Sequence, residues 1–475
     1  FALIFVLCFF HEFTNMFSDK RELVLPEKFF FWRTKLGFFS GFRVLSEHSI
    51  KLTPALVYHA VSLLCYKYSV FVTDVFPIEN TEFGYGLGLV DEVKFSDVVE
   101  FINDETLTPN KILDNYINTK FKYSNNKPLW KLTIINEKYA LFFCDHVLFD
   151  GTSGKNFHTE FAKIIGQGIP PIAAQFFRGL DSVVFQKFEI DPEEYSVLPS
   201  PTDLIKYEGT RLSLIYRLIL ALAPKSISNW IKYLFDGHKY AKILSYDTLS
   251  YRECALIPEK ASSSRIVHLN KDKLDSLLKV CKSNDVKLTA LLITISHISL
   301  GKFIGEQGRD SNIVIPVDIR FLIDEKKAYT LNPNFTSTFG NYVGSVNVNL
   351  PSSKKNCIND KINWETVKFV NETIHEGLPN AATAWELLKF TDIKEYVLER
   401  YSDYNQCTFE ISNIGKISDN IPSIKHAWFD QKSQIFAMNS ISTKEGCNLV
   451  LRCCNEEWID GFASKIENII DELIN

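Results

Sequence analysis

One histidine and one carboxylate, four residues apart, are the residues of this chain best suited to acid–base chemistry. They form the pattern His-x-x-x-Asp-Gly, with His146, Asp150 and Gly151 at its fixed positions. A neutral imidazole near its ordinary pKa is the usual general base at neutral pH. A carboxylate four residues later can bond to the loop or to a cation, and so fix the direction of the imidazole. The pattern therefore predicts a general base at His146.

The flanking sequence indicates which elements position this pattern. Upstream, two short apolar runs between 132 and 143 are separated by a polar break, which is typical of a hairpin. Downstream, residues 152–154 can cap a helix. We expect His146 at the end of a buried strand, followed by a tight turn at Asp150 and Gly151, where glycine permits a positive φ. The pattern alone fits a buried structural histidine before an ordinary turn equally well.

The composition of the chain excludes several classes of protein. Its 475 residues are 46% hydrophobic, which is enough for large cores and suggests two or three domains. A net charge of −5 gives no general attraction to nucleic acid. The ten cysteines include no Cys-x-x-Cys pair and no Cys/His cluster with zinc spacing. We therefore expect reduced, mostly buried thiols in a cytoplasmic protein, and no metal site.

The order of the predicted elements indicates an α/β chain in three parts. Residues 1–175 form a mixed α/β unit that carries His146, residues 176–263 form a crossover broken by prolines, and residues 264–475 form a second α/β unit. Helix-then-strand-pair order in both units suggests two similar layers. Within the crossover, residues 211–235 are helical by pattern and strongly apolar, with basic residues at intervals. This segment is either a membrane-interface helix or a helix that covers another domain.

The pattern at His146 resembles the signature of the CoA-dependent acyltransferase superfamily, which includes chloramphenicol acetyltransferase, the plant BAHD acyltransferases and peptide-synthetase condensation domains. Further segments resemble, in order, motifs of its fungal alcohol acetyltransferase family: a Trp-Arg-x-x-Leu-Gly opening at 32–37, a Val-Asp-x-Arg strand at 317–320, a Phe-Gly-Asn turn at 339–341 and a Ser-Asn-x-Gly segment at 412–415. The resemblance covers nearly the whole chain. The Asp-Phe-Gly-Trp-Gly segment of the plant enzymes is absent, which argues against a plant-type enzyme and leaves the CoA contacts there open.

This resemblance implies an α/β fold of two chloramphenicol acetyltransferase-like subdomains with a solvent tunnel between them. Acetyl-CoA, as co-substrate, and the acceptor would enter from opposite faces and meet at His146. The histidine would take the acceptor's proton during direct attack on the thioester, with no acyl-enzyme and no metal. His146 and Asp150 would be the catalytic residues, and a pair between Asp150 and Arg320, together with Gly151, would hold their loop.

The resemblance also implies which residues line the tunnel. Asn341 is the first candidate, and Ser412 and Asn413 are weaker candidates. For all three, the formation of a turn is an equally good account.

Two classes of function follow. In the first, the chain is an acetyl-CoA-dependent alcohol O-acetyltransferase that forms esters. Its variant is an N-acetyltransferase of a long-chain amine such as a sphingoid base, because the same histidine would serve. In the second, the chain is a catalytically silent lipid-binding or interaction module, which the intact pattern at His146 argues against. We expect a monomer without nucleic-acid partners, cytoplasmic or in peripheral contact with the endoplasmic reticulum or lipid droplets.

Overall fold

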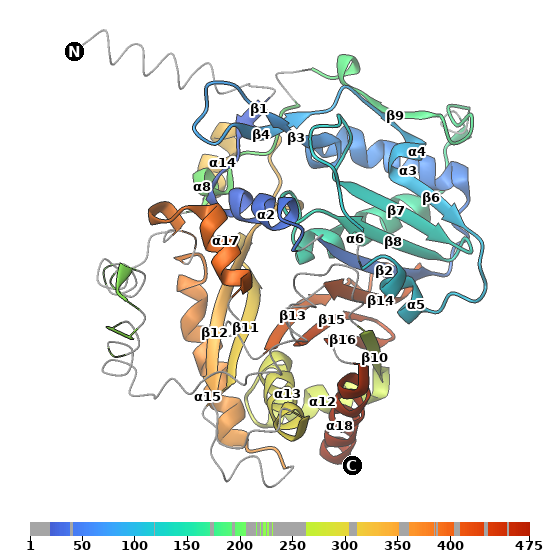
Figure 1. Ribbon diagram of the computed structural model, residues 1–475. Helices are drawn as coiled ribbons and strands as arrows, with labels where there is room; N and C mark the ends of the chain where they lie inside the picture. The colour runs from blue at the N-terminus through green and yellow to red at the C-terminus, as the bar shows by residue number, and fades with distance from the viewer. Residues whose placement is uncertain are drawn as a thin grey trace.

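Two large β-sheets, each packed against helices, make up the protein (Figure 1). The predicted α/β class is therefore confirmed. The computed structural model describes residues 20–475 except residues 39–40, 118, 172–174, 192–194, 206–214, 216–218, 220–221, 225, 228–229, 231–262, 304–310, 351–360, 384, 386–387, 403–408, 432–435 and 454–455.

The first sheet carries the histidine loop and has the strand order β14-β2-β8-β7-β6. Its strands are β2 (Phe42–His48), β6 (Val99–Ile102), β7 (Trp130–Ile135), β8 (Tyr139–Cys144) and β14 (Ile424–Gln431). Strands β7 and β8 form the predicted hairpin. Helix α6 (Gly151–Gln167) packs against β2 and β8, and α3 (Pro54–Lys67) packs against α6. Every residue of β8 after Tyr139 is buried, so its sequence is a continuous apolar run rather than an alternating one.

The second sheet has the strand order β10-β16-β15-β13-β11-β12. Its strands are β10 (Ser263–Asn270), β11 (Ser311–Asp318), β12 (Val343–Leu350), β13 (Phe409–Lys416), β15 (Phe436–Thr443) and β16 (Gly446–Cys453). Its helices are α12 (Lys271–Ser283), α13 (Leu288–Phe303), α15 (Trp364–Gly377) and α18 (Glu456–Ile474). These helices pack against one another and against the sheet, and bury a second apolar core.

Strand β14 joins the two halves of the chain. It belongs to the C-terminal range, yet it pairs antiparallel with β2 of the N-terminal range. A buried ion-pair network crosses this junction, because Asp430 of β14 contacts Arg43 of β2 at 3.0 Å and Arg452 of β16 at 2.8 Å. The predicted division at residue 264 does not include this pairing of β14 with β2. A local sequence pattern does not show which sheet a strand joins.

Shorter elements complete the described chain. A small sheet of order β1-β4-β3 contains β1 (Lys20–Glu22), β4 (Tyr85–Leu89) and β3 (Thr73–Pro77), and β5 (Glu92–Lys94) pairs with β9 (Val183–Gln186). The remaining helices are α2 (Leu25–Lys35), α4 (Phe95–Val98), α5 (Pro109–Asn115), α8 (Pro201–Leu204), α14 (Glu325–Leu331) and α17 (Ile393–Ser402), with 3-10 turns η1 (Ser69–Val72), η2 (Lys187–Glu189), η3 (Arg320–Leu322), η4 (Leu378–Asn380) and η5 (Leu388–Phe390). Helix α2 packs beside α17 of the other half (Figure 1).

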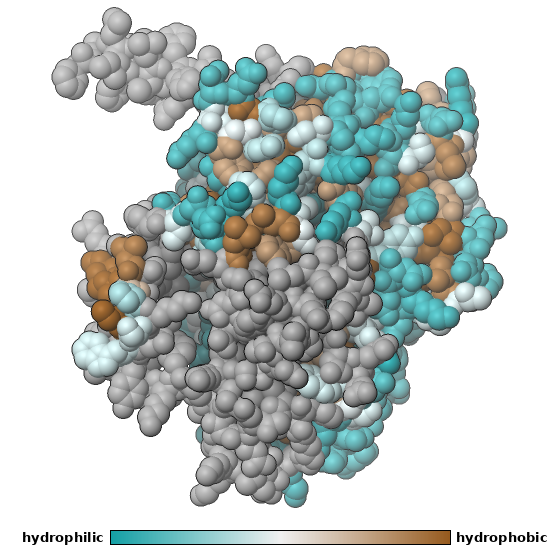
Figure 2. Space-filling view, in the orientation of Figure 1, coloured by the Kyte–Doolittle hydropathy of each residue, from teal (hydrophilic) through white to brown (hydrophobic). Residues whose placement is uncertain are grey.

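The predicted crossover is described only in part. Of the helix predicted at 211–235, the structure describes residues 215, 219, 222–224, 226–227 and 230, and the rest lies outside the described residues. Five apolar side chains in this segment are 46–69% exposed: Ile215, Ile219, Leu222, Ile227 and Trp230. Figure 2 shows hydrophobic side chains gathered at the left edge of the molecule, where this segment lies in Figure 1. None of the described helices is long and apolar enough to cross a membrane.

Candidate active site

The imidazole of His146 lies just beyond the end of strand β8, where the sequence places it. The strand ends at Cys144. The Phe30 ring of helix α2 stacks on the imidazole, with the ring centroids 3.9 Å apart and the planes 13° apart. The Phe42 ring of β2 meets it edge-on, with the centroids 5.6 Å apart. Only 8% of His146 is exposed, so two aromatic rings and the strand end define the orientation of the imidazole.

The surroundings of His146 determine its protonation state. Burial, followed by the positive charge of Arg33, lowers the pKa of His146 to about 3. Hydrogen bonds with the backbone of His146 itself and of Phe149 act in the opposite direction. The ring is therefore neutral at pH 7, which is the form that accepts a proton from a hydroxyl or an amine.

Asn341 contacts the histidine loop directly. Its side-chain amide nitrogen donates a hydrogen bond to the backbone carbonyl of His146, and Asn341 is itself buried. Asn341 follows Gly340, whose φ of 141° is one that L side chains rarely adopt. The glycine thus allows the turn that brings the amide to the loop, and the structure places the predicted Asn341 beside His146.

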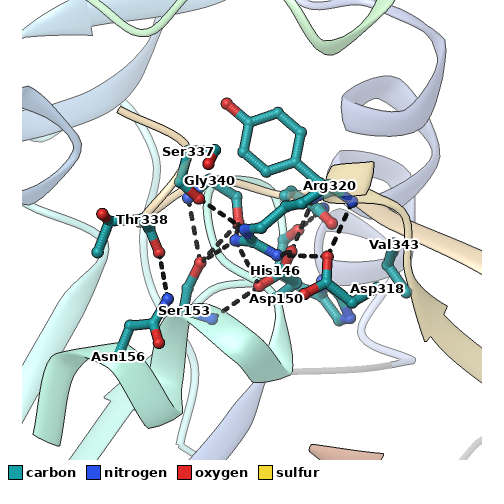
Figure 3. Close-up of polar contacts among 12 residues, drawn as sticks. His146, Asp150, Ser153, Asn156, Asp318, Arg320, Ser337, Thr338, Gly340 and Val343 are labelled. Carbon is teal, nitrogen blue, oxygen red and sulfur yellow. Dashed lines mark hydrogen bonds and ion pairs between the residues drawn. The ribbon is translucent and has the colours of Figure 1, made fainter. Parts of the chain in front are cut away.

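The carboxylate of Asp150 organises the far end of the same loop. One oxygen accepts a hydrogen bond from the N–H of Ser153 at 2.8 Å, which caps helix α6, and the other accepts from the N–H of Tyr342 at 2.8 Å. Arg320 donates to both oxygens, at 2.7 and 3.1 Å (Figure 3). The sequence predicts a cap within residues 152–154, one turn later than the observed one. Asp150 takes this role because it directly precedes the first turn.

Arg320 connects this carboxylate to a turn of the second half. Its Nε donates to the carbonyl of Ser337 at 2.6 Å, and its Nη2 donates to the carbonyl of Gly340 at 3.3 Å. Strand β11 ends at Asp318, so Arg320 begins η3 instead of ending the strand as predicted. Burial lowers the pKa of Arg320, but the carboxylates of Asp150 and Asp318 outweigh it and hold the pKa above its ordinary value. Figure 3 shows these groups converging from separate elements.

Gly151 is required for space rather than for an unusual backbone angle. The positive φ that the sequence analysis expects is not found, because Gly151 is the first residue of helix α6. A Cβ at this position would lie 2.6 Å from Cγ2 of Ile414 and 3.2 Å from Cζ of Phe429. The tight turn into the helix therefore depends on close packing against strands β13 and β14.

Ser412 and Asn413 lie inside strand β13, not at its end. The Asn413 amide donates to Oγ1 of Thr289 at 3.1 Å, and its oxygen accepts from the N–H of Gly415 at 2.9 Å. Ser412 is buried in the strand, in register with Asn439 of β15. Asn413 stands where the register between β13 and β15 begins to shift, so its contacts hold an irregular stretch of the strand rather than a turn. The next residue, Ile414, packs against Gly151.

Helix α2 supplies two neighbours of His146 that the sequence analysis does not single out. Phe30 stacks on the imidazole, and the guanidinium of Arg33 lies 5.5 Å from the centroid of the Phe30 ring. Arg33 belongs to the Trp-Arg-x-x-Leu-Gly opening, whereas Phe30 lies two residues before it. Within the part of the chain that the structure describes, no group of three or more His, Cys, Asp or Glu side chains is arranged to hold a metal ion.

Two curated yeast proteins are similar to this chain over most of its length. The N-acetyltransferase SLI1 of Saccharomyces cerevisiae is 24% identical over 468 residues, which cover 91% of this chain and 94% of that protein. An uncharacterized protein of Schizosaccharomyces pombe is also 24% identical, over 452 residues, which cover 91% of each.

Solved structures share the fold. The trichothecene 15-O-acetyltransferase TRI3 of Fusarium sporotrichioides aligns over 96% of this chain and 94% of its own, with a TM-score of 0.64 and 12% identity. The epimerization domain of the third module of tyrocidine synthetase B aligns over 96% and 97%, with a TM-score of 0.55 and 12% identity. The profile of the alcohol acetyltransferases matches residues 25–470. The chain therefore belongs to the alcohol acetyltransferase family and is an acyl-CoA-dependent acyltransferase.

Proposed function

We propose that the protein transfers the acetyl group of acetyl-CoA to the hydroxyl of an alcohol, with His146 as the general base. The observation that carries this proposal is a neutral imidazole at a strand end, held by contacts from both halves of the chain. Phe30 stacks on the ring, and Asn341 binds its backbone carbonyl. The ion pair of Asp150 and Arg320 attaches the end of the histidine loop to the C-terminal half.

The proposed reaction has two proton transfers and no covalent enzyme intermediate. The imidazole of His146 takes the proton of the acceptor hydroxyl while the acceptor oxygen attacks the thioester carbonyl carbon. The tetrahedral intermediate then collapses, the carbon–sulfur bond breaks, and the imidazolium returns the proton to the CoA thiolate. The products are an acetate ester and CoA, and His146 ends in its starting form.

In this proposal Asn341 and Asp150 act on the loop and not on the substrate. The amide nitrogen of Asn341 already donates to the carbonyl of His146, so it holds the base in place. Both oxygens of Asp150 are occupied by Arg320 and by backbone N–H groups. Asp150 is therefore a structural member of the catalytic loop. Ser412 is kept as a weaker candidate for a substrate contact, and Asn413 is not, because its side chain is bonded to Thr289 and Gly415.

A long-chain amine is the second candidate acceptor. The observation that favours it is the similarity to a yeast N-acetyltransferase along 91% of the chain. The same imidazole would accept a proton from the attacking nitrogen, and the product would be an amide. Phe30, which stacks on His146, packs with Phe29 and Trp385 in an aromatic cluster, and such surroundings suit an apolar acceptor of either kind.

We also propose that the segment at 211–235 makes a peripheral contact with an anionic lipid surface, such as the endoplasmic reticulum or a lipid droplet. Ile215, Ile219 and Leu222 are exposed at the i, i+4, i+7 spacing of one helix face. The segment contains four basic residues and no acidic one. Apolar side chains flanked by basic residues are the combination that binds such surfaces. An acyltransferase placed there would meet apolar acceptors where they concentrate.

The test is an acceptor panel with purified protein. Release of free CoA from acetyl-CoA is followed with a thiol reagent, in the presence of short alcohols, long-chain alcohols or long-chain amines, and products are identified by mass spectrometry. Ester formation supports the first acceptor class, and amide formation supports the second. Absence of acceptor-dependent CoA release with every compound would overturn both and favour a silent lipid-binding module.

A further inference from the structure

A second carboxylate, Asp145, lies directly before the proposed base and is fully buried. Its oxygens accept hydrogen bonds from the hydroxyl of Tyr123 at 3.2 Å, from the hydroxyl of Thr34 at 3.3 Å and from the N–H of Val147 at 2.9 Å. These donors come from three places in the chain: helix α2, the segment after α5, and the histidine loop. Burial raises the pKa of Asp145 to about 7, although the three donors act in the opposite direction.

The helix that reaches Asp145 also covers the imidazole. Thr34 and Phe30 are one turn apart on α2, so they lie on the same face of the helix. Thr34 contacts the Asp145 carboxylate, and Phe30 stacks on His146 at 3.9 Å. Between them, Phe31 stacks on the Tyr123 ring, with the centroids 5.2 Å apart. One face of α2 therefore touches two consecutive residues of the loop and the tyrosine that binds the first of them.

The segment that carries Tyr123 is itself fixed. Asp74 accepts hydrogen bonds from the N–H groups of Asn125 and Asn126, at 3.1 and 3.0 Å. These two hydrogen bonds hold the backbone close to Tyr123, whose hydroxyl donates to Asp145. Asp145 thus joins helix α2 to the segment that carries Tyr123.

We propose that Asp145 is a positioning residue for His146, which ties helix α2 and its Phe30 ring to the strand end that carries the imidazole. This inference rests on the proposed role of His146 as the base. Asp145 would attach the loop to other residues of the N-terminal half. The ion pair of Asp150 and Arg320 attaches the same loop to the C-terminal half. Loss of the Asp145 contacts would let α2 move away from the imidazole. A displacement of about 1 Å at a base lowers turnover by about 100-fold.

The test uses the hydroxyl donors, because Asp145→Asn itself could fail to fold. Thr34→Val and Tyr123→Phe each remove one donor with little change of shape. Thr159→Val and Tyr58→Phe are matched controls, since these hydroxyls bond to the carbonyls of Lys155 and Val183, away from Asp145. Turnover and KM are measured for each variant, together with hydrogen–deuterium exchange of the peptide covering residues 25–36, which needs no activity.

The proposal expects a fall in kcat of about 10-fold or more for Thr34→Val and for Tyr123→Phe, with the KM for acetyl-CoA unchanged, and faster exchange in α2. It expects neither change in the controls. If both variants match their controls in turnover and in exchange, Asp145 does not position the base. If the wild-type protein has no transferase activity, the proposed function fails, while the exchange data still show whether Asp145 anchors α2.

Discussion

Asp150 and Arg320, 170 residues apart in the chain, form a two-point ion pair with N···O distances of 2.7 and 3.1 Å. The same carboxylate caps the helix that follows the histidine loop, and the same guanidinium binds the turn at 337–340. The pair therefore sets the loop of one half of the chain against a turn of the other. This contact fixes the loop that carries the proposed base, His146.

Breaking this pair should disorder the loop. Arg320→Ala removes the cation bound to the buried Asp150 carboxylate, and Asp150→Asn removes the more buried of the two carboxylates that contact Arg320. Breaking a buried ion pair costs about 3–5 kcal/mol. We expect each variant to lose most activity, and thermal denaturation should show the loss of stability. Asp318→Asn is the matched control, because Asp318 also contacts Arg320, at 3.0 Å, but its side chain is 38% exposed. Its effect should stay within about 1 kcal/mol. Normal rates in both test variants would show that the ion pair of Asp150 and Arg320 does not hold the histidine loop in its active form.

A methyl group added at Gly151 should destabilise the protein, although the backbone there is helical. The new Cβ would lie 2.6 Å from Cγ2 of Ile414, and overpacking of this kind costs about 1–3 kcal/mol. Gly166→Ala, in the last turn of the same helix, is the control, because a Cβ there meets nothing within 4 Å. Chemical denaturation should separate the two variants, and equal stabilities would show that the contact with Ile414 relaxes freely.

The histidine loop was predictable from sequence because the elements that hold it are local. A continuous apolar strand, a polar loop and an apolar helix follow one another within about thirty residues. The positive φ predicted for Gly151 is wrong, and local sequence does not show that Ile414 will pack against this glycine. Phe30 and Asp145 were missed for a related cause. A phenylalanine and a buried aspartate have no functional signature until the fold places them beside the imidazole.

The rest of the fold depends on contacts between distant segments. Strand β14, which the sequence analysis does not predict, lies in the C-terminal range but joins the sheet of the N-terminal half through β2. Asp430 on that strand is shared by Arg43 and Arg452 from different sheets. Local sequence can predict that a segment forms a strand. It does not predict which distant strands will lie beside it.

The value of kcat/KM should not fall near pH 6.5, where protonation of an ordinary histidine base would lower it. The pKa of His146 lies near 3, below its ordinary value, so the free enzyme keeps a neutral base throughout the neutral and mildly acidic range. We expect kcat/KM to stay level as the pH falls from 8 to about 5.5. An inflection near the ordinary histidine pKa would show that His146 is solvated in the working enzyme.

Stability should instead limit activity in acid. His48 and His158 are buried and share the Ser46 hydroxyl, at 2.8 and 2.7 Å. Burial lowers the pKa of His48 to about 3 and that of His158 to about 4. The unfolded chain therefore binds protons that the folded chain does not, and stability falls as the pH drops below about 6.5, by up to about 1.4 kcal/mol per pH unit for each histidine. Denaturation midpoints at pH 7.5 and 5.5 check this, and equal midpoints would contradict it.

The proposed lipid contact predicts selective loss of membrane binding. Wild-type protein should sediment with vesicles that contain phosphatidylserine and much less with vesicles of phosphatidylcholine alone. Leu222→Asp and Trp230→Asp each place a charge on an exposed apolar position of the segment and should reduce this binding. Phe188→Asp is the control, because Phe188 is 82% exposed but lies outside the segment. Unchanged binding in both test variants would exclude this surface.

The central claim is that His146 is the base of an acetyl transfer. The most direct measurement compares acceptor-dependent CoA release by the wild-type protein, by His146→Ala and by His375→Ala, a variant at an exposed histidine of helix α15. All three proteins are first matched for folding by thermal denaturation. We predict that His146→Ala loses at least about 100-fold in kcat, as removal of a general base does, and that His375→Ala keeps the wild-type rate. A folded His146→Ala protein that releases CoA at the wild-type rate would contradict the account.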